Sequence, residues 1–160
     1  MNEHGQICGF GGRIINPNDS PKYLNSPETL IFNKRHLLFG LDHAQKSIKE
    51  NNFSIVVEGY MDAIALHSHN ITNAVASLGT AFTAQQCRKI LRYSPNIYFC
   101  YDSDNAGQAA TMRALAIASS NGANVKVITI PDGKDPDEFL RHHGNKEFYA
   151  LIDKALPLME

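Results

Sequence analysis

The amino-acid sequence predicts an α/β protein in which a mostly parallel sheet carries helices on both faces, preceded by a small α+β or β-rich subdomain. Three observations support this prediction. From residue 53 onward, short apolar runs alternate with stretches of helical periodicity. The apolar runs are nearly continuous, as is typical of parallel strands that are buried on both faces. Before residue 53, glycines and prolines interrupt every periodic run, which indicates short strands joined by turns.

The expected elements follow one another in strict alternation after a first helix that begins at Leu41. The strands are expected at about 54–58, 73–77, 96–101 and 125–130, and the helices between them at about 60–69, 83–93 and 105–121. This pattern divides the chain into a small basic, partly irregular subdomain over 1–52, an α/β domain over 53–144 and a C-terminal helical segment over 145–160.

Local signals mark several of the expected helix ends. Thr83 and Gln86 have the spacing of a capping box, in which each side chain bonds the backbone N–H of the other. Gly122 stands where a left-handed residue ends a helix. Ser26-Pro27-Glu28 has the serine cap and the first-turn proline of a short helical turn.

Length and composition narrow the class of protein. The chain has 160 residues, of which 43% are hydrophobic and 19% charged, as in a soluble globular protein of one domain, or of one domain with a small subdomain. No apolar run is long enough to span a membrane, and the first residues do not resemble a signal peptide. Three widely spaced cysteines favour neither a disulfide framework nor structural zinc. We therefore expect a cytoplasmic protein with no membrane partner.

The charge distribution is more informative than the formal net charge of −1. Residues 10–35 are rich in lysine and arginine, whereas residues 132–138 are rich in aspartate and glutamate. A basic first part and an acidic later part would suit a polyanion held against metal ions. Solvated surface charge remains a competing explanation for any single residue.

A carboxylate stands at the end of the first expected strand of the sheet. Glu58 follows the apolar run Ile55-Val56-Val57, and Gly59 allows the backbone to turn into the next helix. Ligands of open parallel sheets bind at the carboxyl ends of the strands, which gives Glu58 a reactive position. Alternatively, Glu58 only begins a turn.

Two later strands also end in acids. Asp102 and Asp104 follow an apolar strand and can point to one side of its end, although Asp104 or Asn105 could equally cap the next helix. Asp135 and Asp137 follow the last strand, where they also make a good helix start. Carboxylates gathered at one sheet edge repel one another unless a cation lies among them. A divalent metal site is the economical explanation.

These acids belong to a set of motifs that carries a family resemblance from about Gly5 to about Pro157. The motifs are Val56–Asp62 with the acids that follow it, Ala76–Thr80, Gly9–Arg13 and Pro21–Thr29. The acidic pattern is similar to the Toprim domain, which bacterial primases share with type IA and type II topoisomerases and some nucleases. Together the motifs resemble the catalytic RNA-polymerase core of a DnaG-type bacterial DNA primase.

The resemblance implies a Toprim fold and a role for each matched residue. The implied catalytic residues are Glu58, Asp102 and Asp104, and the implied metal ligands are these three with Asp135 and Asp137. Gly59 and Asp62 would support them. The residues implied to face the nucleotide and the template are Arg13, Lys22, Asn25 and Lys34. Ser103 stands where the family more often has glycine, a small-for-small change.

The resemblance also implies a mechanism and partners. It implies two-metal-assisted nucleotidyl transfer with Mg²⁺, for which Mn²⁺ can substitute, and no zinc in this chain. The implied partners are a single-stranded DNA template, ribonucleoside triphosphates, and a replicative helicase bound through a domain absent here. The chain looks like a fragment, so we expect it to bind metal and nucleotide weakly and to synthesise primers poorly or not at all.

Two alternatives from other classes stay open at the level of sequence. Another Toprim enzyme, a topoisomerase or nuclease, would need a transesterifying tyrosine in a separate domain or extra nuclease elements. The segment Lys22–Thr29, which is among the primase-like motifs, argues against this alternative. A non-catalytic phosphoacceptor, or receiver-like, module is suggested by Asp102 after an apolar strand. Such a module would instead pair two acids after its first strand and place a lysine after its last.

Overall fold

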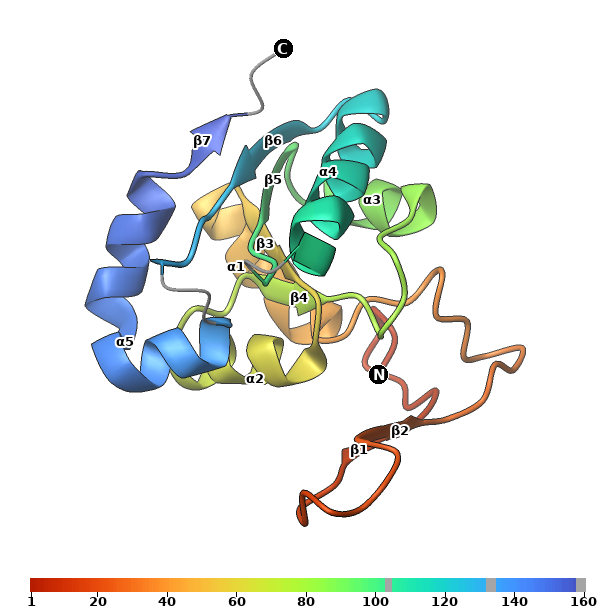
Figure 1. Cartoon of the computed structure of the whole chain (residues 1–160). Helices are drawn as coiled ribbons and strands as arrows, with labels where there is room; N and C mark the ends of the chain where they lie inside the picture. The colour runs from red at the N-terminus through yellow and green to blue at the C-terminus, as the bar shows by residue number, and fades with distance from the viewer. Residues whose placement is uncertain (103–104, 132–134, 158–160) are drawn as a thin grey trace.

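The structure, a computed structural model, describes residues 1–102, 105–131 and 135–157 (Figure 1). Its elements in chain order are β1 (Gly11–Arg13), β2 (Tyr23–Asn25), α1 (Leu41–Asn51), β3 (Ser54–Val57), α2 (Tyr60–Ser68), β4 (Ala74–Ala76), α3 (Ala84–Leu91), β5 (Asn96–Phe99), α4 (Asn105–Ser120), β6 (Asn124–Val127), α5 (Pro136–Asp153) and β7 (Leu156–Pro157). The alternation of strands and helices predicted after residue 53 is confirmed.

Five strands form one sheet in the order β4-β3-β5-β6-β7. β3 runs parallel to β4 and β5 on either side of it, β6 runs parallel to β5, and β7 pairs antiparallel with β6. The mostly parallel sheet predicted from the sequence is therefore confirmed. Because β3, β5 and β6 run in the same direction, the loops that follow them meet at one edge of the sheet.

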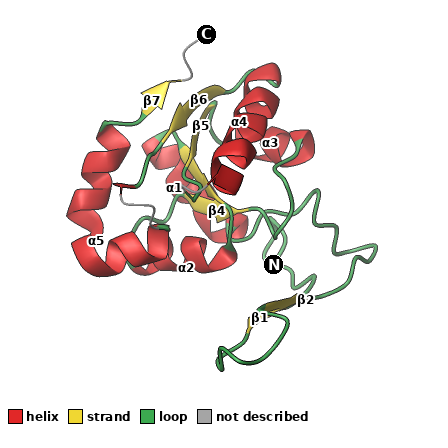
Figure 2. Cartoon of the chain, viewed as in Figure 1, coloured by secondary structure: helices red, strands yellow, loops and turns green. Residues whose placement is uncertain are grey.

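Helices cover both faces of this sheet (Figure 2). Val56 of β3 packs with residues of α1, α3 and α4 on one face, whereas Ile55 and Val57 pack with residues of α2 and α5 on the other. All four residues of β3 are buried, as expected for a central parallel strand. None of the helices within the described ranges combines the length and apolar character needed to cross a lipid bilayer.

The N-terminal part carries a two-stranded antiparallel ribbon, β1-β2, that projects from the body of the molecule (Figure 1). The helical turn predicted at Ser26-Pro27-Glu28 is wrong. The Ser26 hydroxyl accepts the Phe10 N–H at 2.9 Å, and the Ser26 N–H donates to the Phe10 carbonyl at 2.9 Å. Ser26 therefore prolongs the pairing of the ribbon, and its side chain is not available to cap a helix.

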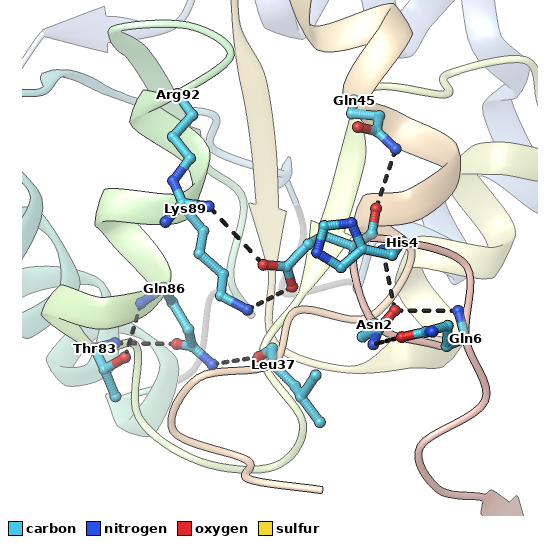
Figure 3. Close-up of polar contacts among 10 residues, drawn as sticks. Asn2, His4, Gln6, Leu37, Gln45, Thr83, Gln86, Lys89 and Arg92 are labelled. Carbon is cyan, nitrogen blue, oxygen red and sulfur yellow. Dashed lines mark hydrogen bonds and ion pairs between the residues drawn. The ribbon is translucent and has the colours of Figure 1, made fainter. Parts of the chain in front are cut away.

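Side chains of α3 fix the N-terminal part to the body (Figure 3). Gln86 is fully buried, and its Nε2 donates to the carbonyls of Lys34 at 3.0 Å and Leu37 at 2.8 Å. Its Oε1 accepts the Thr83 N–H at 3.0 Å, which completes the predicted capping box. One turn further on, the ammonium of Lys89 lies 2.6 Å from the carboxylate of Glu3.

The C-terminal segment differs in part from the helix predicted over 145–160. Helix α5 begins earlier, at Pro136, has a kink at Gly144 with φ of 77°, and ends at Asp153. Leu156 and Pro157 then form β7 against the outer edge of β6. This pairing satisfies backbone groups that β6 would otherwise expose, and a two-residue edge strand has too short a pattern to be recognised in the sequence.

We expect Gln86→Leu to lower the free energy of unfolding by about 2–4 kcal/mol, because it leaves two buried carbonyls and a helix-cap N–H without this partner. Gln85→Leu, the same change at the half-buried neighbouring position, is the control and should alter it by about 0.5 kcal/mol or less. Urea unfolding followed by circular dichroism measures both. Equal effects of the two substitutions would contradict the anchoring role of Gln86.

Candidate functional site

One cavity of about 330 Å³ gathers most of the residues that the motifs single out. It lies where the loops after β3 and β5 and the start of α5 approach the β1-β2 ribbon, and we call it the acidic cavity. Its lining comprises Arg13, Lys22, Tyr23, Asn25, Glu58, Gly59, Tyr60, Met61, Asp62, Gly79, Asp102, Asp135 and Asp137. Five carboxylates thus face one space from three segments that are far apart in the sequence.

The turn from β3 into α2 positions the first pair of acids. Glu58 follows the last residue of β3, and Gly59 is the N-cap of α2 in an extended conformation. A Cβ atom at Gly59 would lie 2.9 Å from Oδ2 of Asp62, so a side chain there would displace that carboxylate. Asp62 lies in the first turn of α2 and accepts a hydrogen bond from the Gly59 N–H. Gly59 therefore supports the position of Asp62 through both its size and its backbone.

The electrostatic effect of this crowding is greatest at Asp62. Burial raises the pKa of Asp62, and the nearby charges of Asp135, Asp102 and Asp137 raise it further, to about 7. The hydrogen bond from Gly59 acts in the opposite direction but does not compensate. Burial is the larger cause of the shift, and the smaller cause is the one that the sequence suggested, since acids from separate strand ends disfavour one another's ionisation.

Asp102 is held at the end of β5 by a close approach of α4. An added Cβ at Gly107, in the first turns of α4, would lie 2.0 Å from the carbonyl oxygen of Asp102. Only glycine fits there without moving the Asp102 backbone. Sequence reasoning missed this residue, although a glycine five positions after an acid and inside a helix is a usable signal. Asp104, predicted as a catalytic and metal-binding residue, lies outside the described residues.

Asp135 and Asp137 combine two kinds of role. Asp135 is the N-cap of α5, where its side chain accepts the Glu138 N–H at 2.7 Å and Pro136 occupies the first turn. Asp137 pairs with Arg141 one turn later in α5. The two residues therefore do form the helix start that the sequence offered as the alternative to metal binding. Both carboxylates also line the acidic cavity.

Basic and aromatic residues of the ribbon form the opposite wall. Arg13 and Lys22 both lie over the ring of Tyr23, at 5.8 Å and 5.6 Å from its centroid. Tyr23 in turn meets the ring of Tyr60 edge-on at 5.6 Å, which links the ribbon to α2. Asn25 lines the cavity, whereas Lys34 does not and lies in the segment bound by Gln86. Tyr60 was missed as a lining residue despite its place in the first motif.

The donor set suits a hard divalent cation in its chemistry. Carboxylate oxygens are the ligands that Mg²⁺ prefers. The pKa of Asp62 is raised first by burial and then by the charges of the neighbouring acids, and a cation would relieve the second of these effects. Within residues 1–102, 105–131 and 135–157, no three histidine, cysteine or acidic side chains converge closely enough to hold a metal by themselves. Mg²⁺ is commonly held by one or two carboxylates together with water and substrate phosphates, so the site fits a cation shared with a phosphate group.

Comparison with known families matches two parts of the chain. A Toprim-like family matches residues 55–140, which is more than half of the chain. The N-terminal domain of the DNA primase catalytic core matches residues 1–45. The Toprim fold implied by the motifs is confirmed by the match and by the observed sheet.

Individual proteins give the same assignment. The DNA primase of Clostridium acetobutylicum is 48% identical over 159 residues, which cover 98% of this chain and 26% of that protein. For the DNA primase of Escherichia coli K12 the identity is 46%, with 98% of this chain and 27% of that protein covered. The chain therefore spans about a quarter of the length of these curated relatives.

Solved structures extend the likeness to three dimensions. The zinc-binding and RNA polymerase domains of the Aquifex aeolicus primase superpose with a TM-score of 0.92 at 42% identity, covering 98% of this chain and 39% of that one. A DnaG primase catalytic domain bound to single-stranded DNA superposes with a TM-score of 0.89 at 45% identity, covering 98% and 51%. The chain belongs to the Toprim-like family and is homologous over nearly its whole length to the catalytic core of the bacterial DnaG-type DNA primases.

Proposed function

We propose that this chain carries the catalytic centre of a DNA-directed RNA polymerase that makes short RNA primers on single-stranded DNA during replication. The observation that supports this most is the acidic cavity, where five carboxylates face the cationic side chains of Arg13 and Lys22. Acids alone would suit metal binding, and cations alone would suit nucleic acid. Their apposition suits nucleotidyl transfer from a triphosphate to a hydroxyl, because that reaction uses both metal ions held by acids and cationic side chains that bind phosphate.

The site residues would divide the work by charge. Glu58, Asp102, Asp135 and Asp137 would hold Mg²⁺, or Mn²⁺ in its place, with Asp104 as a further ligand and Asp62 in support. Two such ions, when bound, would supply Lewis-acid activation of a 3′-hydroxyl and stabilisation of the pyrophosphate leaving group. Arg13 and Lys22 would bind the triphosphate and the template backbone.

The similar DNA primases suggest further binding partners for this chain. One DnaG catalytic domain of the same fold is described as bound to single-stranded DNA, and we extend that partner to this chain. Ribonucleoside triphosphates, a replicative helicase reached through another part of the protein, and a cytoplasmic, nucleoid-associated location belong to the same proposal. Because the chain covers about a quarter of its relatives, we expect weak or no primer synthesis by these residues alone.

The alternatives drawn from sequence are less well supported. The match of residues 1–45 to a primase N-terminal domain favours primase over a topoisomerase or nuclease with the same Toprim core. A phosphoacceptor module would need Asp102 accessible to a phosphodonor, and acetyl phosphate labelling of Asp102 distinguishes it from metal binding.

Metal binding tests the centre of this proposal. Asp102→Asn should weaken Mn²⁺ binding by about 10-fold or more, because it removes one charged ligand from a cavity that a cation neutralises. Asp153→Asn, which removes an exposed carboxylate near the end of α5, is the matched control and should bind as the wild type does. Electron paramagnetic resonance of free Mn²⁺ measures both. Unchanged affinity after loss of Glu58 and Asp102 together would refute the metal site.

The pH dependence of stability gives a second test, made in EDTA. The pKa of Asp62 is raised to about 7 in the folded chain, whereas the ordinary pKa of an aspartate is 3.8. Between these two pH values, the folded state therefore keeps a proton that the unfolded state has lost. The contribution of Asp62 to the free energy of unfolding is therefore fully present below pH 4 and is lost as the pH rises toward 7. Asp62→Asn removes this loss, so its stability relative to the wild type should increase between pH 4 and pH 8.

Urea unfolding at these pH values measures the difference, and added Mg²⁺ should reduce it at pH 8 by neutralising the surrounding acids. A difference between Asp62→Asn and the wild type that stays constant from pH 4 to pH 8 would show that the cavity does not shift this pKa. The asparagine oxygen can still accept the Gly59 N–H, which keeps the start of α2 intact.

A further inference from the structure

A second cavity, of about 250 Å³, lies on the other side of Glu58, and we call it the α4-side cavity. Its lining comprises Glu58, Ser77, Gly79, Thr80, Ala81, Phe82, Tyr101, Ala110, Arg113 and Ala114. It shares Glu58 and Gly79 with the acidic cavity, so the two spaces adjoin. A ligand whose phosphates lie in one could therefore place its remaining atoms in the other.

The position of Tyr101 follows from the packing of β5. Its ring meets the Phe99 ring edge-on at 5.7 Å and belongs to the core under α1, α3 and α4. Its side chain is thus directed to the α4 face of the sheet, where Glu58 stands two positions after Val56 of the same core. Tyr101 is only 7% exposed, and the nearby Glu58 carboxylate is one cause of its raised pKa, after burial.

Two hydroxyl groups in this cavity are buried without partners. The Tyr101 hydroxyl and the Thr80 Oγ1 make no hydrogen bond of ordinary geometry with any described residue. The Ser77 side chain acts on the Tyr101 hydroxyl as a weak hydrogen-bond partner that lowers the pKa of Tyr101 somewhat, but the contact lacks the geometry of an ordinary hydrogen bond. Polar groups buried in this way usually meet a ligand or ordered water, because desolvation without a hydrogen bond is costly.

The walls carry one cationic side chain, Arg113, and one carboxylate, Glu58, whose charges oppose each other, so they favour a neutral group with hydroxyls, such as a sugar, over an anion. A hydroxyl of Tyr or Thr can donate and accept, whereas a carboxylate such as Glu58 accepts only and repels negative charge. A ligand hydroxyl can bond all three groups, and a phosphate cannot. The apolar wall of Phe82, Ala110 and Ala114 suits the carbon face of a furanose ring. The volume lies below the range typical of sites for drug-sized ligands, as a single sugar ring requires.

We propose that the α4-side cavity receives the ribose of a ribonucleotide whose phosphates lie in the acidic cavity, and that the hydroxyls of Tyr101 and Thr80 bond its 2′-hydroxyl. The inference rests on the proposed function and adds a basis for choosing ribonucleotides over deoxyribonucleotides. A nucleotide without the 2′-hydroxyl leaves both protein hydroxyls buried and unsatisfied, which is how a polar pocket rejects an analogue that lacks one group.

The test is calorimetric titration of this chain with ATP and with 2′-deoxy-ATP in Mg²⁺. We expect wild type to bind ATP roughly 3- to 10-fold more tightly, the ratio that one net hydrogen bond produces. Tyr101→Phe should bring the ratio close to one without weakening 2′-deoxy-ATP. Tyr98→Phe is the matched control, because Tyr98 packs on the opposite face of the sheet, stacked on Phe53, and it should keep the wild-type ratio.

The outcomes separate this inference from the function on which it rests. Binding of both nucleotides with equal affinity by wild type, or an unchanged ratio in Tyr101→Phe, would overturn the ribose site and leave the metal site standing. Failure of both nucleotides to bind in Mg²⁺ would instead overturn the proposed function and the inference with it. Thr80→Val provides the same comparison should Tyr101→Phe fail to fold, and retention of the wild-type ratio by it would then overturn the inference.

Discussion

Mutual repulsion of carboxylates at one edge of a parallel sheet is the constraint on which the rest of this structure depends. Parallel strands deliver their carboxyl ends to a common edge, and here acids follow β3, β5 and the last parallel strand, β6. Burial raises the pKa of Asp62, and the repulsion from Asp135, Asp102 and Asp137 raises it further. Local features reduce this repulsion in part: the Gly59 N–H bonds Asp62, the start of α5 accommodates Asp135, and Arg141 pairs with Asp137. What these contacts leave uncompensated is negative charge, which a divalent cation would balance.

The cationic wall is attached differently from the acidic one. The acids stand on strand ends and helix starts of the main sheet, whereas Arg13 and Lys22 stand on a ribbon of two three-residue strands. Such a ribbon has little stability of its own, so its position depends on contacts with the body. The edge-on meeting of Tyr23 with Tyr60 is one such contact, and the segment held by Gln86 is another. The apposition of the two charge types is therefore a product of tertiary packing.

This difference explains what the sequence could and could not predict. The strands of the sheet and the acids behind them were predicted because each depends on a local apolar run that ends in a charged residue. The absence of Lys34 from the cavity, the pairing of Ser26 with Phe10 and the short strand β7 were not predicted. Each is decided by a partner distant in sequence, on which local spacing gives no information. Gly107 lies between these two cases. Its position five residues after Asp102 can be seen in the sequence, but the need for a glycine there, which is the close approach of the Asp102 carbonyl, can be seen only in the structure.

Glu58 is the point at which these separate arrangements meet. It stands at the end of β3, a fully buried strand, and borders both cavities, the acidic cavity toward the ribbon and the α4-side cavity toward α4. With a ribonucleotide bound as proposed, a carboxylate in that position would contact two chemically different parts of one ligand, so its location would be constrained from both sides. A shorter acid at this position would face the same backbone but could not reach as far into either space. The need to serve two adjoining cavities therefore gives a physical reason for a glutamate, rather than an aspartate, at the end of β3.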